Sequence, residues 1–196
     1  MGSDFSSAIR PALIMTLLFA LLVGLVYPFA ILGIGQAVFP SQANGSLVRE
    51  GGKVIGSTVI GQAFTSDRYF QTRPSAAGKG YDGLNSSGSN LGPASKDLVT
   101  RVKADVAKRR SEGLAGPLPA DLVTASGSGL DPDLSPESAL AQVPRVAKVR
   151  GLAEPQVRAL VAQSIDEPTF GFLGERHVNV FTLNRQLDQI GVKPSK

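Results

Sequence analysis

Few residues of this chain could carry out chemistry, and none of them forms a recognisable catalytic pattern. The 196 residues include no cysteine and a single histidine, His177. Thiolate nucleophiles, thiolate metal sites and disulfides are therefore excluded, and a zinc site built on imidazole would need further histidines. A Ser–His–Asp triad would have to use His177, which lies in GERHVNVF beside a predicted strand, and the chain has no nucleophile-elbow motif. We interpret His177 as a surface or packed histidine.

The densest group of carboxylates is Asp131, Asp133 and Glu137, which follows the segment SGSGL. Carboxylate oxygens suit hard cations such as calcium, but this spacing differs from that of the twelve-residue calcium loop. The intervening prolines, Pro132 and Pro136, fit a turn and the first turn of a helix, and Asp also favours turns. We therefore favour capping and turn formation over a cation site.

The strongest signal is an N-terminal apolar segment, which has no Asp, Glu, Lys or Arg from Pro11 to Val48. A helix needs about 20 such residues to cross the hydrocarbon core of a bilayer, and this one shows no polar face. It exceeds the roughly 7–15 apolar residues of a cleaved signal peptide. We predict a membrane-spanning helix from Ile9 to about Gly33, with Pro28 kinking or ending its regular part.

Small residues recur at every fourth position of this predicted helix. Helices in lipid associate mainly by close packing at small side chains, so this stripe is a candidate contact face for a partner helix. Its members are Ala12, Thr16, Ala20 and Gly24.

Arg10 lies at the N-terminal end of the predicted helix, whereas the other flank has no positive charge before Arg49. Because positive charge is enriched on the cytoplasmic side, we expect the N-terminus inside and the rest of the chain outside. The expected organisation is a cytoplasmic tail over residues 1–8, an anchor with a juxtamembrane segment over 9–38, and one extracytoplasmic domain over 39–196.

The formal net charge of +4 is small and spread along the chain. It does not suggest nucleic acid as a partner, because nucleic-acid binding needs a concentrated basic face. The one dense basic run is Lys108-Arg109-Arg110. We interpret this run as the solvated C-terminal end of a helix, where the helix dipole favours positive charge.

Turn residues and hydrophobic periodicity predict an α+β domain after the anchor. A β-hairpin is expected over 45–61 around Gly51-Gly52, followed by a long packed loop over 64–93. Ser95 and Ser135 suit the N-caps of two helices, and a third helix starts at Glu154-Pro155. The second of these helices is predicted to place Leu140, Val143, Val146 and Val149 on its inner face. Further expected elements are strands at 122–125 and 178–181 and a last helix at 184–190.

The chain resembles the KdpC family, the C subunits of bacterial Kdp potassium-transporting P-type ATPases, over nearly its whole length. ASGSGLDP at 125–132 is the most specific match, and the sequence departs from the family pattern at Ser87 and Asp133. The other matching motifs are RPA at 10–12, GSTVIGQ at 56–62, YF at 69–70, RPSA at 73–76, GSNLGP at 88–93, RVAKVR at 145–150, FLGE at 172–175 and VNV at 178–180.

The resemblance implies a non-catalytic accessory subunit of a high-affinity potassium uptake complex in the bacterial inner membrane. Its partners would be a channel-like potassium-binding subunit, a P-type catalytic subunit, a small single-helix subunit and membrane lipid. The complex would use ATP, magnesium and potassium, and this chain would bind no cofactor itself. The implied role is assembly of the complex, or covering or gating of the potassium entrance.

The Gly-, Ser- and Asn-rich loops offer backbone and hydroxyl groups that suit docking on a polar surface. A family role in ATP binding, through Gln62 and Ser126, disagrees with the predicted topology, which places both residues outside the cytoplasm. The alternative is a membrane-anchored envelope enzyme or a free-standing binding protein, which would need a pocket of convergent titratable groups. The candidate interface residues are Gln62, Asn90, Ser126, Ser128, Asp131 and Asn179.

Overall fold

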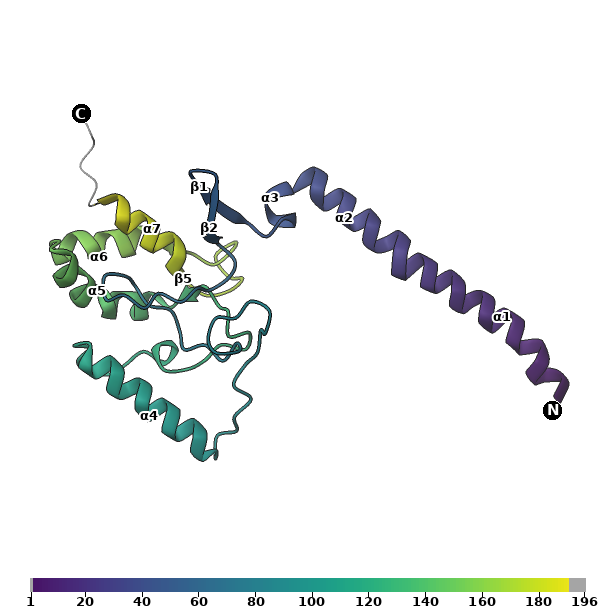
Figure 1. Cartoon of the computed structure of the whole chain (residues 1–196), viewed down its shortest axis with the longest axis horizontal. Helices are drawn as coiled ribbons and strands as arrows, with labels where there is room; N and C mark the ends of the chain where they lie inside the picture. Colours follow the sequence, from purple (N-terminus) through teal and green to yellow (C-terminus); the bar gives the residue numbers. More distant parts are fainter. Residues whose placement is uncertain (1, 191–196) are drawn as a thin grey trace. The chain divides into compact units, whose positions relative to one another are not determined.

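A computed structural model of the chain describes residues 2–190. The chain divides into two compact units with a boundary between Leu47 and Val48. Figure 1 labels the helices and strands along the sequence, from the N-terminal helix in purple to helix α7 in yellow. The fold is α+β, as the sequence predicts, with the regular elements other than the N-terminal helices and the start of β1 lying in the second unit.

The first unit is helical. Helices α1 (Gly2–Leu21) and α2 (Tyr27–Val38) are joined without a break by a π-helical turn, Leu22–Val26, and a short helix α3 (Pro40–Ala43) follows. Within the described residues, one helical stretch, Ser6–Val38, is long and apolar enough to cross a membrane. Its apolar side chains are exposed within the unit, as expected of a helix whose surroundings are lipid.

Pro28 lies in the first turn of α2, and the helix continues through it to Val38. Proline lacks an N–H donor and its ring crowds the carbonyl of the residue four positions earlier, here Gly24. The π-helical turn Leu22–Val26 contains that residue and immediately precedes α2. A wider turn relieves this kind of crowding. The helix therefore accommodates Pro28 by a local change to π-helical geometry, and it does not end there.

The predicted β-hairpin is confirmed. Strands β1 (Leu47–Glu50) and β2 (Lys53–Ser57) form a two-stranded sheet. The two residues between them, Gly51 and Gly52, have φ of +55° and +81°. Two successive left-handed residues match the twist of an antiparallel hairpin, and glycine adopts this conformation with little steric strain.

The rest of the second unit packs helices against a small antiparallel sheet. Strand β5 (His177–Asn179) lies between β3 (Asp133–Leu134) and β4 (Ile165–Asp166), with Val178 opposite both Leu134 and Ile165. Helices α4 (Lys96–Ser111), α5 (Pro136–Arg150), α6 (Glu154–Gln163) and α7 (Val180–Ile190) and a 3₁₀ turn (Ala120–Leu122) complete it. The core is formed mainly by Phe70, Leu122, Leu134, Val143, Val146, Val157, Val161, Val178, Val180, Leu183 and Leu187.

Three local predictions about this unit are wrong. Of the expected strand at 122–125, Leu122 ends the 3₁₀ turn and residues 123–125 form no strand. The nearby strand is β3, in a segment predicted to be loop. The strand at 178–181 ends at Asn179, because helix α7 begins at Val180, four residues before its predicted start. Val149 is exposed, and α5 turns Ala139, Val143, Val146 and Ala147 inward.

The interpretation of Arg109 as part of a solvated helix end is also wrong. Arg109 is 5% exposed, and its guanidinium donates to Gln71 Oε1 at 2.6 Å and to Glu112 Oε2 at 3.0 Å. It also donates to the carbonyl oxygens of Leu122 and Thr72. Helix α4 therefore attaches to the domain through a buried charged side chain as well as through its half-buried apolar stripe.

Two buried amides hold the long loop 64–93 in place. Phe70 N donates to Asn184 Oδ1 at 2.8 Å, and Asn184 Nδ2 donates back to Phe70 O at 2.9 Å. Gln142 on α5 pairs in the same way with the backbone N–H and C=O of Gln71, at 2.8 and 3.0 Å. These amide side chains satisfy backbone groups that a strand partner would otherwise satisfy. A loop without regular structure can therefore cross the core.

Candidate functional site

Three segments that are distant in the sequence meet in one cluster of loops, and Ser75 joins two of them. Its hydroxyl donates to the carbonyl oxygen of Gly129 at 2.6 Å and accepts from the backbone N–H groups of Ala77 and Tyr81. The segment 86–87 is held against the same strip of chain, because Ser87 N donates to Ser128 O at 2.9 Å. We call segments 58–62, 73–90 and 124–131 the loop cluster.

Glycines allow the close approach of these backbones. Gly61 N donates to Leu130 O at 2.7 Å, and a Cβ on Gly61 would lie 2.5 Å from Asp131 O. Gly129 has φ of +66°, and a Cβ there would lie 2.6 Å from both Ala77 N and Ser87 O. Both distances are too short for a real side chain, so each glycine is needed for packing.

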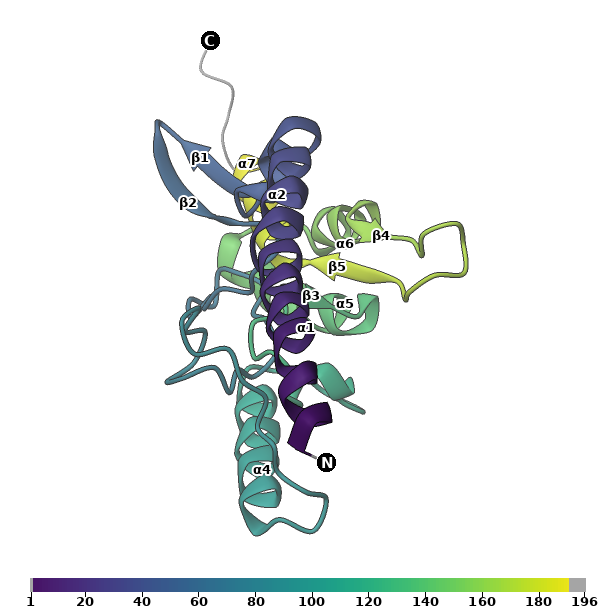
Figure 2. The same cartoon turned by 90° about the vertical axis from the view of Figure 1, so that its right-hand side faces the viewer.

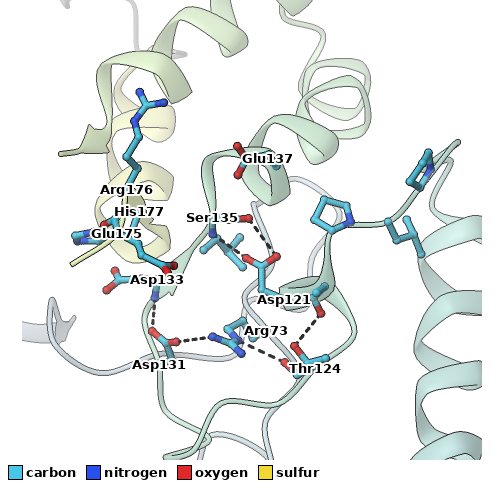
Figure 3. Close-up of a pocket in the computed structure, with 15 residues that line it drawn as sticks. Arg73, Asp121, Thr124, Asp131, Asp133, Ser135, Glu137, Glu175, Arg176 and His177 are labelled. Atoms are coloured by element: carbon cyan, nitrogen blue, oxygen red, sulfur yellow. Dashed lines mark hydrogen bonds and ion pairs between the residues drawn. The ribbon is translucent and has the colours of Figure 1, made fainter. Parts of the chain in front are cut away.

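An ion pair crosses the loop cluster at the edge of an open groove (Figure 3). Arg73 Nη1 lies 3.0 Å from Asp131 Oδ2, and Arg73 Nε donates to Thr124 O. The other carboxylate oxygen of Asp131 accepts from Asp133 N at 3.0 Å. Asp131 thus fixes the turn that leads into β3, in agreement with the structural role predicted for it.

The groove has a volume of about 810 Å³ and is lined mainly by acidic and proline-rich segments. Asp121 accepts from the backbone N–H of Ser135 at 2.7 Å and from the hydroxyls of Ser135 and Ser138 at the start of α5. Burial raises the pKa of Asp133, which also accepts from Asn179 Nδ2. Among the described residues, no group of His, Cys, Asp and Glu side chains could hold a metal ion.

His177 lies at the rim of this groove, on β5. Its Nδ1 is 3.0 Å from Glu175 O, and its Nε2 is 3.9 Å from Asp166 Oδ2. The hydrogen bond to the Glu175 carbonyl is the main cause of a raised pKa, and neighbouring carboxylates add to it. Within the described residues, no hydroxyl is hydrogen-bonded to either ring nitrogen, so the groove shows no hydroxyl–histidine pair.

The structure brings most of the candidate interface residues into or beside the loop cluster. Ser126 and Ser128 lie in the 124–131 segment, where the Ser128 carbonyl accepts from Ser86 and Ser87. Gln62 is half-buried, and its Nε2 donates to Ser57 O at 3.3 Å.

Asn179 and Asn90 have different roles. Asn179 Nδ2 donates to Thr58 O at 2.9 Å, and its Oδ1 accepts from Thr182 N in the first turn of α7. Asn90 is exposed with φ of +51°, a left-handed conformation that Asn tolerates. No hydrogen bond of its side chain occurs in residues 2–190, so its role in the loop is conformational.

The predicted small-residue stripe is exposed on the N-terminal helix. Within residues 2–190, a Cβ added to Gly24 would meet nothing within 4 Å, so the stripe leaves room for another helix. Sequence reasoning missed the buried polar residues that hold segment 67–72, which leads into the loop cluster. Their signal was a polar residue inside an apolar helical stripe, as Gln142 lies beside Val143 and Val146 on α5. They are Gln71, Arg109, Gln142, Arg145 and Asn184.

The fold defines a class of protein: a small α+β domain that follows one N-terminal helix able to span a membrane. The chain matches the family model described as K+-transporting ATPase, c chain, over residues 9–189, and it belongs to this KdpC family.

Curated relatives cover nearly the whole chain. A protein of Caulobacter vibrioides (strain NA1000 / CB15N), named potassium-transporting ATPase KdpC subunit, is 54% identical over 93% of both chains. Proteins with the same name from Rhodopseudomonas palustris (strain TIE-1) and Methylobacterium nodulans are 53% and 51% identical. These two matches cover 92% and 94% of this chain, and 96% and 98% of the relatives.

Proposed function

We propose that this chain is a non-catalytic accessory subunit of an ATP-driven potassium uptake pump. The observation that carries the proposal is the similarity to subunits named potassium-transporting ATPase KdpC, which extends over 93% of both chains for the Caulobacter relative. The non-catalytic part rests on the residue types of the chain, which has no cysteine and a single histidine. The chemistry of ATP hydrolysis and ion passage then belongs to other subunits.

The proposed partners are a channel-like potassium-binding subunit, a P-type ATPase subunit and a small single-helix subunit. We propose that this chain binds neither ATP, magnesium nor potassium itself, although the whole complex uses all three. The small-residue stripe on the N-terminal helix supports a contact between helices within the membrane. Such a contact would contribute to assembly, in which the outer domain supplies a second, polar contact.

The loop cluster is the surface that we propose for the polar contact. Ser75, Gly61 and Gly129 connect its segments by short hydrogen bonds and close backbone contacts. A surface held in one conformation before binding loses little conformational entropy on docking. Exposed hydroxyl and carbonyl groups of the 124–131 segment suit a polar partner near the potassium entrance, where the domain would assist assembly or cover the entrance.

The proposed location is the bacterial inner membrane, with the N-terminus in the cytoplasm and the domain outside. Arg10 on the N-terminal side of the helix supports this orientation. A Ser128→Cys variant in intact spheroplasts should react with an impermeant thiol reagent, since the chain has no other cysteine. Labelling only after lysis would show that the domain lies in the cytoplasm, which would allow a contact with cytoplasmic ATP.

The proposed surface is tested by replacing Asp131 and Asn90 separately with alanine in the reconstituted complex. Asp131→Ala removes the ion pair to Arg73 and the turn hydrogen bond to Asp133, and Asn90→Ala disfavours the left-handed backbone. We expect both variants to lower recovery of the complex or its potassium-dependent ATPase activity.

The matched control is Glu154→Ala, which removes an exposed ion pair of similar length, 3.1 Å, on helix α6. Circular dichroism of each purified variant would show whether the domain has folded. Normal recovery and a wild-type potassium response in both test variants would contradict the proposed surface. A hydrolytic activity of the chain alone would instead support the anchored-enzyme alternative.

A further inference from the structure

The loop between β4 and β5 presents three apolar side chains to solvent. Phe170 is 83% exposed, Phe172 is 74% exposed, and Leu173 is 52% exposed. Figure 2 shows β5 and the loop before it extending away from helices α5 and α6. The two rings lie near each other, with centroids 6.5 Å apart. We call Phe170, Phe172 and Leu173 the aromatic tip.

The aromatic tip is held by a closed turn. Thr169 and Leu173 exchange backbone hydrogen bonds, both of 3.0 Å, and Gly171 N donates to Pro168 O at 2.8 Å. Behind the turn, β4 and β5 are fixed in the core through Ile165, which lies opposite the fully buried Val178. The exposed rings are therefore presented by an ordered backbone.

The backbone at the tip is also in an unfavourable conformation. Phe170 has φ of +56°, a left-handed value that a bulky side chain with a Cβ rarely adopts. Glycine follows at Gly171, which has φ of +79°. Such conformations persist where the surrounding structure imposes them, and they concentrate at functional surfaces. Here the strained residue is the one that carries the most exposed ring.

Clustered exposed aromatic side chains mark contact surfaces, and aromatic residues that fill pockets dominate the binding energy of protein interfaces. A membrane surface is the other apolar partner to consider. The segment 166–177 carries the carboxylates Asp166, Glu167 and Glu175 and a single arginine, Arg176, which leaves a net charge of −2 with His177 neutral. Loops that bind bilayers carry basic flanks, because anionic lipid attracts them.

The charge around the tip therefore favours a protein pocket over a lipid surface. Arg176 is already paired with Glu167, at 2.9 Å, so Asp166 and Glu175 supply most of the uncompensated negative charge beside the rings. A complementary site would be apolar at its centre and basic at its rim, as charged groups are depleted from interface cores and common at interface edges.

We propose that the aromatic tip inserts into an apolar pocket with a basic rim on another subunit of the potassium pump. This contact is separate from the loop cluster, and it rests on the proposed function because it takes its partner from that complex. The tip acts as an anchor, and the carboxylates beside it orient the domain on the partner.

The test places p-benzoylphenylalanine, a photoreactive amino acid, in place of Phe172 in the complex purified from native membranes. Irradiation should attach this chain to another pump subunit, and mass spectrometry identifies the attached peptide. Attachment to lipid alone, to a second copy of this chain, or to nothing while the complex remains intact would overturn the proposal. Failure of the chain to purify with any pump subunit would instead contradict the proposed function as well.

A second measurement uses the double variant Phe170→Asn and Phe172→Asn, which removes both rings. Asn is chosen because it tolerates the left-handed backbone at position 170. We expect its recovery in the washed complex to fall about tenfold or more, as for loss of an interface anchor. The matched control is Val99→Gln, which removes an exposed apolar side chain on helix α4. Equal recovery of the double variant and the control would also overturn the proposal.

Discussion

Removing the guanidinium of Arg109 should destabilise the α+β domain strongly, although the sequence shows Arg109 only as one residue of a basic run. The Glu112 side chain is only 10% exposed, and its carboxylate lies 3.0 Å from the Arg109 guanidinium. Arg109→Ala removes this partner and leaves a nearly buried carboxylate unpaired with it. It also leaves Gln71 Oε1 and the carbonyl oxygens of Leu122 and Thr72 without this donor. Loss of one partner of a buried pair costs about 3–5 kcal/mol.

For a domain of about 150 residues, each kcal/mol changes the melting temperature by about 2–4 °C. The expected decrease for Arg109→Ala is therefore about 6–20 °C. Thermal unfolding of the full chain in mild detergent, followed by circular dichroism, would measure it. The neighbouring Lys108→Ala is the control, because the Lys108 side chain is 62% exposed and lies 3.9 Å from Glu112. Exposed pairs of this kind contribute at most about 1 kcal/mol.

The reasoning would be refuted if Arg109→Ala and Lys108→Ala melted at the same temperature. Hydrogen exchange gives a further check, because the loss of stability should appear first in helix α4 and in the segment around Gln71. Uniform exchange across the domain, with no local increase at these two places, would contradict the role given to Arg109 in attaching α4.

Three further predictions follow from other parts of the chain. Gly129→Ala should destabilise the domain by about 1–3 kcal/mol through steric overlap and the positive φ, whereas Gly127→Ala, which has open space, should change the melting temperature little. The pKa of His177 is raised, chiefly by its hydrogen bond to the Glu175 carbonyl. The protonated imidazole therefore contributes stability that is fully present below about pH 6.5 and is lost as the pH rises through the folded-state pKa. His177→Gln should flatten the pH dependence of the unfolding free energy just above about pH 6.5. Gly24→Leu should weaken subunit association by about 1 kcal/mol per lost contact while leaving the melting of the α+β domain unchanged, and unchanged pull-down of the complex would count against this helix face.

Features encoded by local chemistry could be predicted from the sequence. The apolar helix follows from composition, the hairpin from Gly51-Gly52, and the start of α5 from Ser135, whose hydroxyl accepts from Ser138 N at 3.2 Å. These signals depend on residues close together in the chain, where propensity and turn geometry decide the conformation.

Features that depend on distant contacts could not be predicted in this way. Arg109 is buried because Gln71, 38 residues away, accepts its hydrogen bond, and a basic run gives no sign of that partner. Strand β3 is two residues long and is defined by its pairing with β5. Propensity over so short a segment is overridden by tertiary context.

The candidate site shows the same division. The motif ASGSGLDP could be identified as a loop, and Asp131 as a turn residue, from residue types alone. The contacts that join this loop to Ser75 and Gly61 connect segments more than 50 residues apart. Their geometry explains why glycines occupy these positions, but only once the backbones have been placed against each other.

The central claim, that this chain is a subunit of a potassium pump, is tested most directly by purification through a tag on the chain from native membranes in mild detergent. ATPase activity of the purified material is then measured against potassium concentration. We predict that a channel-like subunit and a P-type ATPase subunit purify with the chain and that potassium stimulates the hydrolysis of ATP. Recovery of the chain alone, or of a complex without potassium-stimulated ATPase activity, would contradict the claim.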